Sequence, residues 1–189
     1  MTKNKREFRP FHIADEQIRL LERLSNACAV SGDEGEVRKI VLEEVSPHAT
    51  EVKVDALGNV LVTRRSKNEN ALRVMLAAHM DEVGMMVTNE DGDGLYRFEV
   101  VGGLDVWKLS GKAVWVGKEH LPGVIGLKPI HLAERDELGR PVTLDGLRID
   151  LGPGAKAKVG ERAVFSTSFA LLGPSLRGKA LDDRIGVAT

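Results

Sequence analysis

The hydrophobic pattern of the chain changes near Met85, and this change limits the folds that the chain can adopt. Before Met85, apolar residues recur at helical spacing in two segments, one from Asp15 to about Asn26 and one from Ser31 to Pro47. After it, short β-type runs are separated by glycine, proline or charged turns: LYRFEVVGG, KAVWVG, LPGVIGLKP, LRIDLG and RAVFSTSFALL. We therefore predict an α/β protein interrupted by a β-barrel or sandwich-like insertion of roughly ninety residues, the usual size of a small all-β module.

Two amphipathic helices are predicted before the insertion. The first runs from Asp15 to about Asn26. The second begins in SGDEGEVRKIVLEEVSP, where Ser31 and Glu34 have the form of a capping box and Pro47 ends the helical pattern. Both helices should place their apolar stripes against a common core.

Two β elements are expected between these helices and the insertion. The stretch TEVKVDALGNVLVTRR predicts a hairpin, because alternating valines flank a Gly-Asn turn. The run LRVMLAA, residues 72–78, shows no alternation. It is typical of a strand covered on both faces inside an α/β sheet, and we expect such a strand to end at His79.

Composition and charge exclude several classes of function. The chain has 27 basic and 28 acidic residues and a formal net charge of −1, so we expect no nucleic-acid partner. Cys28 is the only cysteine, which excludes an internal disulfide and agrees with a reducing cytoplasm. We expect no signal peptide and no membrane segment. Motifs for a serine nucleophile, a phosphate loop or a dinucleotide are absent from the sequence.

Three titratable residues interrupt the apolar run VMLAAHMDEVGMMV. His79 would lie at the carboxyl end of a buried strand, where open α/β sheets place their ligands. Asp81 would point to the same side and could orient the imidazole of a metal-binding histidine. The simpler interpretation is a polar cluster at the end of a strand. Glu82 could be a solvated loop acid or a gatekeeper beside the site.

The other candidate site residues are harder to assign from the sequence. The Asp182-Asp183 pair in GKALDDRIG could be a helix cap with Arg184 as an ion-pair partner, and spacing alone favours this interpretation. The remaining histidines, His12, His48, His120 and His131, are expected to lie outside the site, with His131 the most interesting because its loop is bounded by proline.

Six ordered segments carry a resemblance to a known family. They are SGDEGEVR, VDALGNV, MLAAHMDEVGMMV, LPGVIGLKPIHL, LRIDLG and GKALDDRIG. Together they resemble the dinuclear metallo-aminopeptidases of metallopeptidase family 42, over a stretch from about Ile18 to the last residue. The resemblance implies an α/β metallopeptidase domain, with a partial parallel or mixed sheet and helices, interrupted by a β-rich dimerisation domain. We expect the first part at 1–84, the insertion at 85–172 and the return at 173–189.

The resemblance also implies a site and a reaction. His79 would be a ligand of one metal, Asp81 the catalytic acid that orients it, and Asp182 the carboxylate that bridges two metals. Two divalent ions, zinc or cobalt, would activate water and polarise the scissile carbonyl of a peptide at its N-terminal residue. Peptides would be the substrates, and a homo-oligomer, a dimer or larger, is the expected assembly.

The sequence departs from the family pattern at its end. The family's glutamate pair, a further acidic ligand and a second histidine ligand follow the DDR segment, and this chain ends six residues after Asp183. We therefore expect an incomplete or split aminopeptidase that needs a second polypeptide. The rival hypothesis is a non-catalytic dimerisation module. A third, glycan hydrolysis, is disfavoured because the adjacent Asp81 and Glu82 would face opposite sides of a strand.

Overall fold

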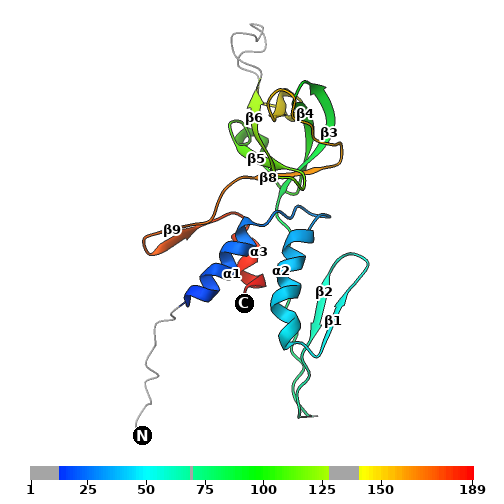
Figure 1. Cartoon of the computed structure of the whole chain (residues 1–189), viewed down its shortest axis with the longest axis vertical. Helices are drawn as coiled ribbons and strands as arrows, with labels where there is room; N and C mark the ends of the chain where they lie inside the picture. The colour runs from blue at the N-terminus through cyan, green and yellow to red at the C-terminus, as the bar shows by residue number, and fades with distance from the viewer. Residues whose placement is uncertain (1–12, 69, 128–140) are drawn as a thin grey trace.

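The chain folds into a closed β-barrel joined to a group of helices and hairpins. The structure, a computed structural model, describes residues 13–68, 70–127 and 141–189. The barrel occupies one end of the molecule, and the helices lie at the other end with the C-terminus among them (Figure 1). This mixed α/β architecture with a β-rich insertion agrees with the sequence prediction.

Three helices lie within the described part of the chain. Helix α1 spans Asp15–Asn26, α2 spans Gly35–Val45 and the short α3 spans Leu181–Val187. The first two confirm the predicted helices. None of the helices in the described residues is long and apolar enough to cross a membrane.

The capping box predicted for the second helix is wrong. Helix α2 has Glu34 at its N-cap position with no side-chain cap hydrogen bond, and the 3-10 turn Ser46–His48 follows its last residue. The Ser31 hydroxyl instead donates a hydrogen bond to a carboxylate oxygen of Asp81. The sequence has the pattern of a cap, but the Ser31 hydroxyl bonds the distant Asp81 and not the backbone of its own helix.

Two short antiparallel hairpins flank the helices. Strands β1, Glu51–Val54, and β2, Val60–Thr63, pair as predicted and lie beside α2 (Figure 1). Strands β9, Ala170–Leu172, and β10, Ser175–Arg177, form the second hairpin after the barrel. Each hairpin is a separate two-stranded sheet.

Six strands close the barrel in the order β3-β4-β7-β6-β5-β8. All the pairings are antiparallel, and β3 and β8 close the ring through the pairing of Met85 with Ala163. Closure removes the free strand edges that an open sheet would present. The strands are β3 Gly84–Gly92, β4 Leu95–Val101, β5 Ala113–Val116, β6 Leu121–Leu127, β7 Leu147–Asp150 and β8 Arg162–Phe165.

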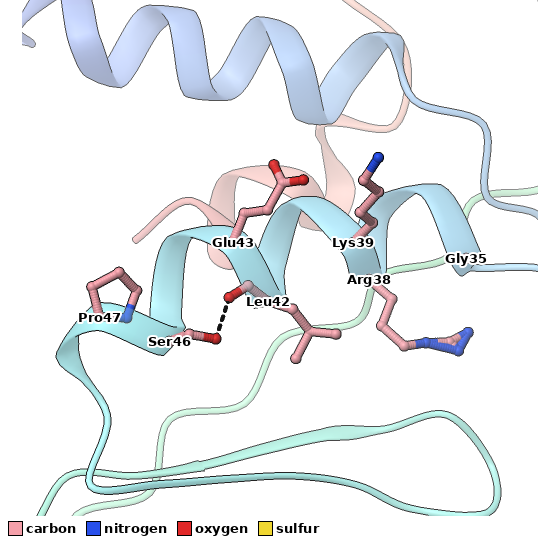
Figure 2. Close-up of a pocket in the computed structure, with 7 residues that line it drawn as sticks. All are labelled: Gly35, Arg38, Lys39, Leu42, Glu43, Ser46 and Pro47. Carbon is pink, nitrogen blue, oxygen red and sulfur yellow. Dashed lines mark hydrogen bonds between the residues drawn. The ribbon is translucent and has the colours of Figure 1, made fainter.

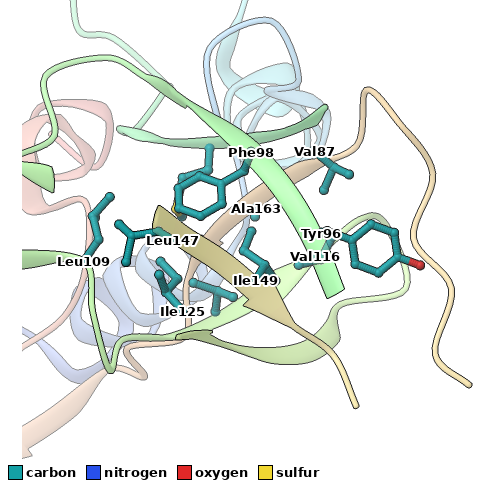
Figure 3. Close-up of a cluster of buried hydrophobic side chains, with 11 residues drawn as sticks. Val87, Tyr96, Phe98, Leu109, Val116, Ile125, Leu147, Ile149 and Ala163 are labelled. Atoms are coloured by element: carbon teal, nitrogen blue, oxygen red, sulfur yellow. The ribbon is translucent and has the colours of Figure 1, made fainter. Parts of the chain in front are cut away.

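The barrel interior is filled by apolar side chains (Figure 3). Alternate residues of each strand point inward, as the period-2 pattern requires. Tyr96 and Phe98 on β4 are buried, and so are Leu147 and Ile149 on β7. The other buried members of the cluster are Met85, Val87, Leu109, Val114, Val116, Ile125 and Ala163. The barrel thus has a hydrophobic core of its own.

The helical part has a smaller core and a tight joint to the barrel. Leu24, Ala27, Ala29 and Val37 form its buried apolar cluster. An isolated parallel bridge pairs Val30 with Glu82, just before the barrel begins. A Cβ at Gly84 would lie 2.5 Å from a Val30 methyl carbon and 2.6 Å from the Ala163 carbonyl oxygen. Glycine at this position therefore allows the chain to pass between the two parts.

The predicted buried strand at residues 72–78 is wrong as an element of this chain. These residues are not in a strand, and their apolar side chains are exposed, with Leu72 at 92% and Leu76 at 86% exposure. A buried strand needs partner strands and covering helices, and none of the described residues pairs with this segment. The expected sheet of a metallopeptidase domain is not formed by the described residues.

Candidate metal centre

His79 lies between two carboxylates at the end of the exposed apolar segment. Its Nδ1 is 3.0 Å from Oδ1 of Asp81, and its Nε2 is 3.2 Å from Oδ1 of Asp182. Asp81 therefore lies on the same side as His79, as strand alternation predicts. Asp182 comes from the other end of the chain, so folding brings together the three residues that the sequence singled out.

The two carboxylates favour the charged form of the imidazole. Desolvation lowers the pKa of His79, but the hydrogen bonds with Asp182 and Asp81 outweigh it, and the net pKa lies above the ordinary value of 6.5. Because each ring nitrogen faces an acceptor, the metal-free site stabilises a doubly protonated ring. A divalent ion would replace one of these protons.

A hydrogen bond on the side away from His79 fixes the Asp81 carboxylate. The Ser31 hydroxyl, on the loop before α2, donates to Oδ2 of Asp81 while Oδ1 faces the imidazole. The hydrogen bond from Ser31 is the largest of the effects that hold the pKa of Asp81 below 3.8, and His79 contributes in the same direction. Both carboxylate oxygens are thus engaged, which fixes the direction in which Asp81 faces His79.

Asp182 and Asp183 have different surroundings although they are adjacent. The Asp182 side chain is 97% exposed, with His79 as its partner. Oδ1 of Asp183 accepts a hydrogen bond from the Gly186 N–H at 3.1 Å. Both aspartates lie inside α3, whose N-cap residue is Ala180, so neither of them is the cap residue that the sequence suggested. The peptide bond between the two residues is cis. Arg184 does not pair with either aspartate but points into the protein.

Glu82 is buried in a cluster of charges, so its interpretation as a solvated loop acid is wrong. Its Oε1 is 2.5 Å from Lys179 Nζ and 3.4 Å from an Arg184 guanidinium nitrogen. Oε1 also accepts the Ala29 N–H at 3.2 Å. Lys179 donates further to the Ala27 carbonyl, and Arg184 to the Leu24 carbonyl. The cluster joins the C-terminal segment to the loop after α1.

Two hollows lie elsewhere on the molecule. One, of about 490 Å³, runs along a single face of α2 and is lined by Gly35, Arg38, Lys39, Leu42, Glu43, Ser46 and Pro47 (Figure 2). A second, of about 360 Å³, lies between the loop after α1, the start of α2 and the barrel, with Cys28, Glu36 and Trp115 among its walls. Neither is lined by His79.

The family assignment follows from comparison with known sequences. The sequence model of the M42 glutamyl aminopeptidase family matches residues 58–189. The chain belongs to this M42 family. The matched region contains the barrel, His79, Asp81 and Asp182, so the residues that meet in space lie within it.

Individual relatives of known sequence or structure support this family assignment. The TET aminopeptidase of a marine sediment Thaumarchaeota archaeon is 33% identical, with a TM-score of 0.82 over 92% of this chain and 51% of that one. The Pyrococcus horikoshii TET1 peptidase, described as assembling into a tetrahedron or a large octahedral shell, is 32% identical with a TM-score of 0.76 over 91% and 53%. The lysyl aminopeptidase of Pyrococcus furiosus is 31% identical over 88% and 51%. The chain spans about half the length of the curated relatives it matches.

The donors at His79 suit a metal ion of the kind that the M42 family implies. Two ligands bound at zinc distances of about 2.0–2.2 Å with a tetrahedral angle would lie about 3.4 Å apart. Nε2 of His79 and Oδ1 of Asp182 are 3.2 Å apart, so a small adjustment admits an ion between them. Imidazole and carboxylate ligands suit zinc and cobalt alike.

The other histidines of this M42 chain that the structure describes do not contact His79. His48 is exposed, as expected, and His12 and His131 lie outside the described residues. His120 also lies away from His79, but it has a partner of its own, since its Nε2 is 2.6 Å from Oε1 of Glu36 on α2. No sequence signal links these residues, which are 84 positions apart.

Proposed function

We propose that this chain supplies the first half of a metal-dependent aminopeptidase, with His79 and Asp182 as metal ligands and Asp81 as the residue that orients His79. The observation that carries the proposal is the meeting of both His79 ring nitrogens with carboxylates from distant parts of the chain. The M42 match over the same residues supports it. The substrates would be peptides with a free N-terminal residue.

The roles follow from the geometry. His79 would present Nε2 to an ion that it shares with Asp182, while Asp81 holds Nδ1–H and so fixes the tautomer and the direction of the ring. Ser31 would keep Asp81 in this direction. When bound, two divalent ions of zinc or cobalt supply Lewis acidity toward the scissile carbonyl and favour deprotonation of water. The exposed Asp182 side chain would offer its second oxygen to a second ion.

Residues outside these 189, in a continuation of the chain or in a second polypeptide, would complete the enzyme. His79 and Asp182 are two ligands, whereas a catalytic zinc has three protein ligands besides water. Residues 72–76, just before His79, have exposed apolar side chains, the largest exposures being those of Leu72 and Met75. An unpaired apolar segment of this kind pairs readily with an added strand. The residues that supply the missing ligands would therefore also cover this segment.

The test is complementation. We expect the purified 189-residue chain with zinc or cobalt to release no amino acid from unblocked peptides. Mixing it with a polypeptide equivalent to the second half of an M42 relative should produce release. The substitution His79→Ala should abolish this release, whereas His48→Ala, at an exposed histidine, should leave it unchanged. Release that survives His79→Ala in the mixture would contradict the proposed site.

A second candidate function is a dimerisation module formed by the barrel. The closed barrel with its own apolar core favours it, because such a unit needs no further polypeptide to fold. We also infer a homo-oligomer, by analogy with the assemblies described for the TET1 relative, and a cytoplasmic location that suits the single free thiol. Analytical ultracentrifugation of the chain tests the assembly directly.

Glycan hydrolysis remains disfavoured. A glycosidase needs two carboxyl groups that both reach the sugar. Glu82 is engaged by Lys179 and Arg184 in the interior, so it does not share a face with Asp81.

A further inference from the structure

A cysteine, a glutamate and a histidine from three separate elements meet where the helical part contacts the barrel. Cys28 lies in the loop after α1, Glu36 in the first turn of α2 and His120 in the turn between β5 and β6. One potential ligand atom from each of the three lies within 4.8 Å of the other two. These residues line, or lie beside, the hollow of about 360 Å³ between the two parts.

The three side chains are held in place before any ligand arrives. Oε2 of Glu36 accepts the backbone N–H of Cys28 at 2.9 Å, and Oε1 faces Nε2 of His120 at 2.6 Å. The His120 ring stacks on Trp115, with ring centroids 5.8 Å apart and an interplanar angle of 11°. These contacts fix the position of the carboxylate and the direction of the imidazole.

The backbone at His120 is unusual for a residue with a side chain. Its φ of 50° lies in the left-handed region, which non-glycine residues seldom adopt. The turn from Gly117 to His120 is closed by a hydrogen bond from the His120 N–H to the Gly117 carbonyl at 3.1 Å. This turn aims the imidazole out of the barrel, toward α2.

We propose that Cys28, Glu36 and His120 bind one zinc ion, which clamps the helical part of the chain to the barrel. Thiolate, imidazole and carboxylate together are a zinc-type donor set, since calcium and magnesium prefer oxygen ligands alone. At zinc bond lengths, tetrahedral ligand atoms lie about 3.4–3.6 Å apart. The ion would take the place of the proton between Glu36 and His120, whose Oε1 and Nε2 atoms are 2.6 Å apart. Those two atoms would have to separate by about 0.8 Å to reach tetrahedral zinc geometry.

The fourth position faces the hollow. Three protein ligands leave one tetrahedral position for water or a small ligand. The walls there also carry Lys39, Lys118 and Arg162, so an anionic group in that position would be favoured. This site is separate from His79 and needs no second polypeptide. Its existence does not depend on the proposed peptidase function.

Cobalt spectroscopy tests the proposal. Because Cys28 is the only cysteine, any cobalt–thiolate charge-transfer band reports this site. The His79→Ala variant of the full chain, titrated with cobalt, should give that band with tetrahedral d–d absorption at one equivalent per chain. Adding Cys28→Ser, which keeps the size of the side chain, should remove the band. If His79→Ala shows no charge-transfer band at saturation, the proposal is overturned.

Zinc affinity gives an independent readout. In the His79→Ala background, competition with a chromophoric chelator should show one zinc per chain. His120→Asn keeps a residue type that tolerates the left-handed backbone and should weaken zinc binding by at least about 100-fold, since even indirect partners of a zinc site cost 10–100-fold. The matched control His48→Asn should leave the affinity unchanged. Equal affinity in His120→Asn would mean that His120 and Glu36 form only an ion pair.

Thermal unfolding checks the clamp. Zinc should raise the unfolding midpoint of the His79→Ala variant, because an ion that binds only the folded state stabilises it. The increase should vanish on adding Cys28→Ser, and circular dichroism without zinc should show that both variants are folded. A zinc-dependent increase that persists after Cys28→Ser would overturn the assignment.

Discussion

The barrel and the helical part of this chain are stabilised by different interactions. The barrel closes on itself and fills its interior with eleven buried apolar residues. The buried apolar cluster of the helical part has only four residues, and a charge cluster of Glu82, Lys179 and Arg184 lies near them. Stabilisation by apolar burial is non-directional and does not depend on one specific partner. A buried charge, in contrast, is strongly destabilising when any one of its partners is removed. We infer that the barrel is the autonomous part and that the helical part depends on a few specific contacts.

The largest effect should come from removing the charge at the centre of the helical part. Glu82→Gln leaves Lys179 and Arg184 buried without their carboxylate, and breaking a buried ion pair in this way costs about 3–5 kcal/mol. Urea unfolding followed by far-ultraviolet circular dichroism measures the loss. Asp91→Asn, which removes ion pairs with Arg97 and Arg148 on the barrel surface, is the control, and its loss should be much smaller because solvent screens these pairs. Equal losses in the two variants would contradict the proposed difference between the two parts.

A pair of truncations compares the barrel core with the exposed segment. Ile125→Ala inside the barrel should lose about 2–5 kcal/mol of unfolding free energy, because it removes a fully buried side chain. Leu76→Ala in the isolated chain should stay within about 0.5 kcal/mol, because that side chain is 86% exposed. If Leu76→Ala destabilised the chain as much as Ile125→Ala, residues 72–78 would be buried in solution.

The response to pH should differ between the two parts. His79 has a raised pKa in the folded chain, so its contribution to stability is present below pH 6.5 and is lost as the pH rises through the folded value. The hydrogen bond from Arg148 lowers the pKa of Asp91, so its contribution is present above 3.8 and is lost as the pH falls through the folded value.

NMR titration of the metal-free chain measures both groups. The His79 imidazole should titrate above 6.5, and Asp182→Asn should lower that pKa because it removes one of the two carboxylates. A His79 pKa that does not respond to Asp182→Asn would show that the contact between them does not form in solution.

The smallest effect should follow the loss of the hydroxyl behind Asp81. Ser31→Ala removes one hydrogen bond and should cost about 1 kcal/mol. It should also raise the pKa of Asp81 toward its ordinary value, because the bond from Ser31 is the largest cause of the lowering. Carbon-13 NMR of the Asp81 carboxyl measures the change. Ser66→Ala, at an exposed serine, should leave that signal unmoved.

Short-range sequence patterns correctly predicted the elements whose contacts are local in sequence. Helix α1, the β1-β2 hairpin and the change to β structure near Met85 depend on short-range periodicity and turns, and all three are present. The partnership of His79 and Asp81 follows from alternation over three residues. These features need no knowledge of what lies elsewhere in the chain.

Prediction failed where a residue depends on a distant partner. Residues 72–78 have the composition of a buried strand, but their burial needs neighbours that the described residues do not supply. Ser31 bonds a carboxylate 50 positions away and not its own helix. Glu82 meets a lysine 97 positions later, and His120 a glutamate 84 positions earlier. Single-sequence patterns carry no information on such pairs.

The alternation of Asp81 and Glu82 has a consequence for how this segment tolerates insertions and deletions. One carboxylate faces His79, and the next one along the chain faces the interior cations. Loss or gain of a single residue between Asp81 and Gly84, where the barrel begins, would exchange these directions, since extended backbone turns each successive side chain to the opposite face. Conservative substitutions here alter one group, but a length change of one residue would disrupt the metal-facing side and the anchored side together.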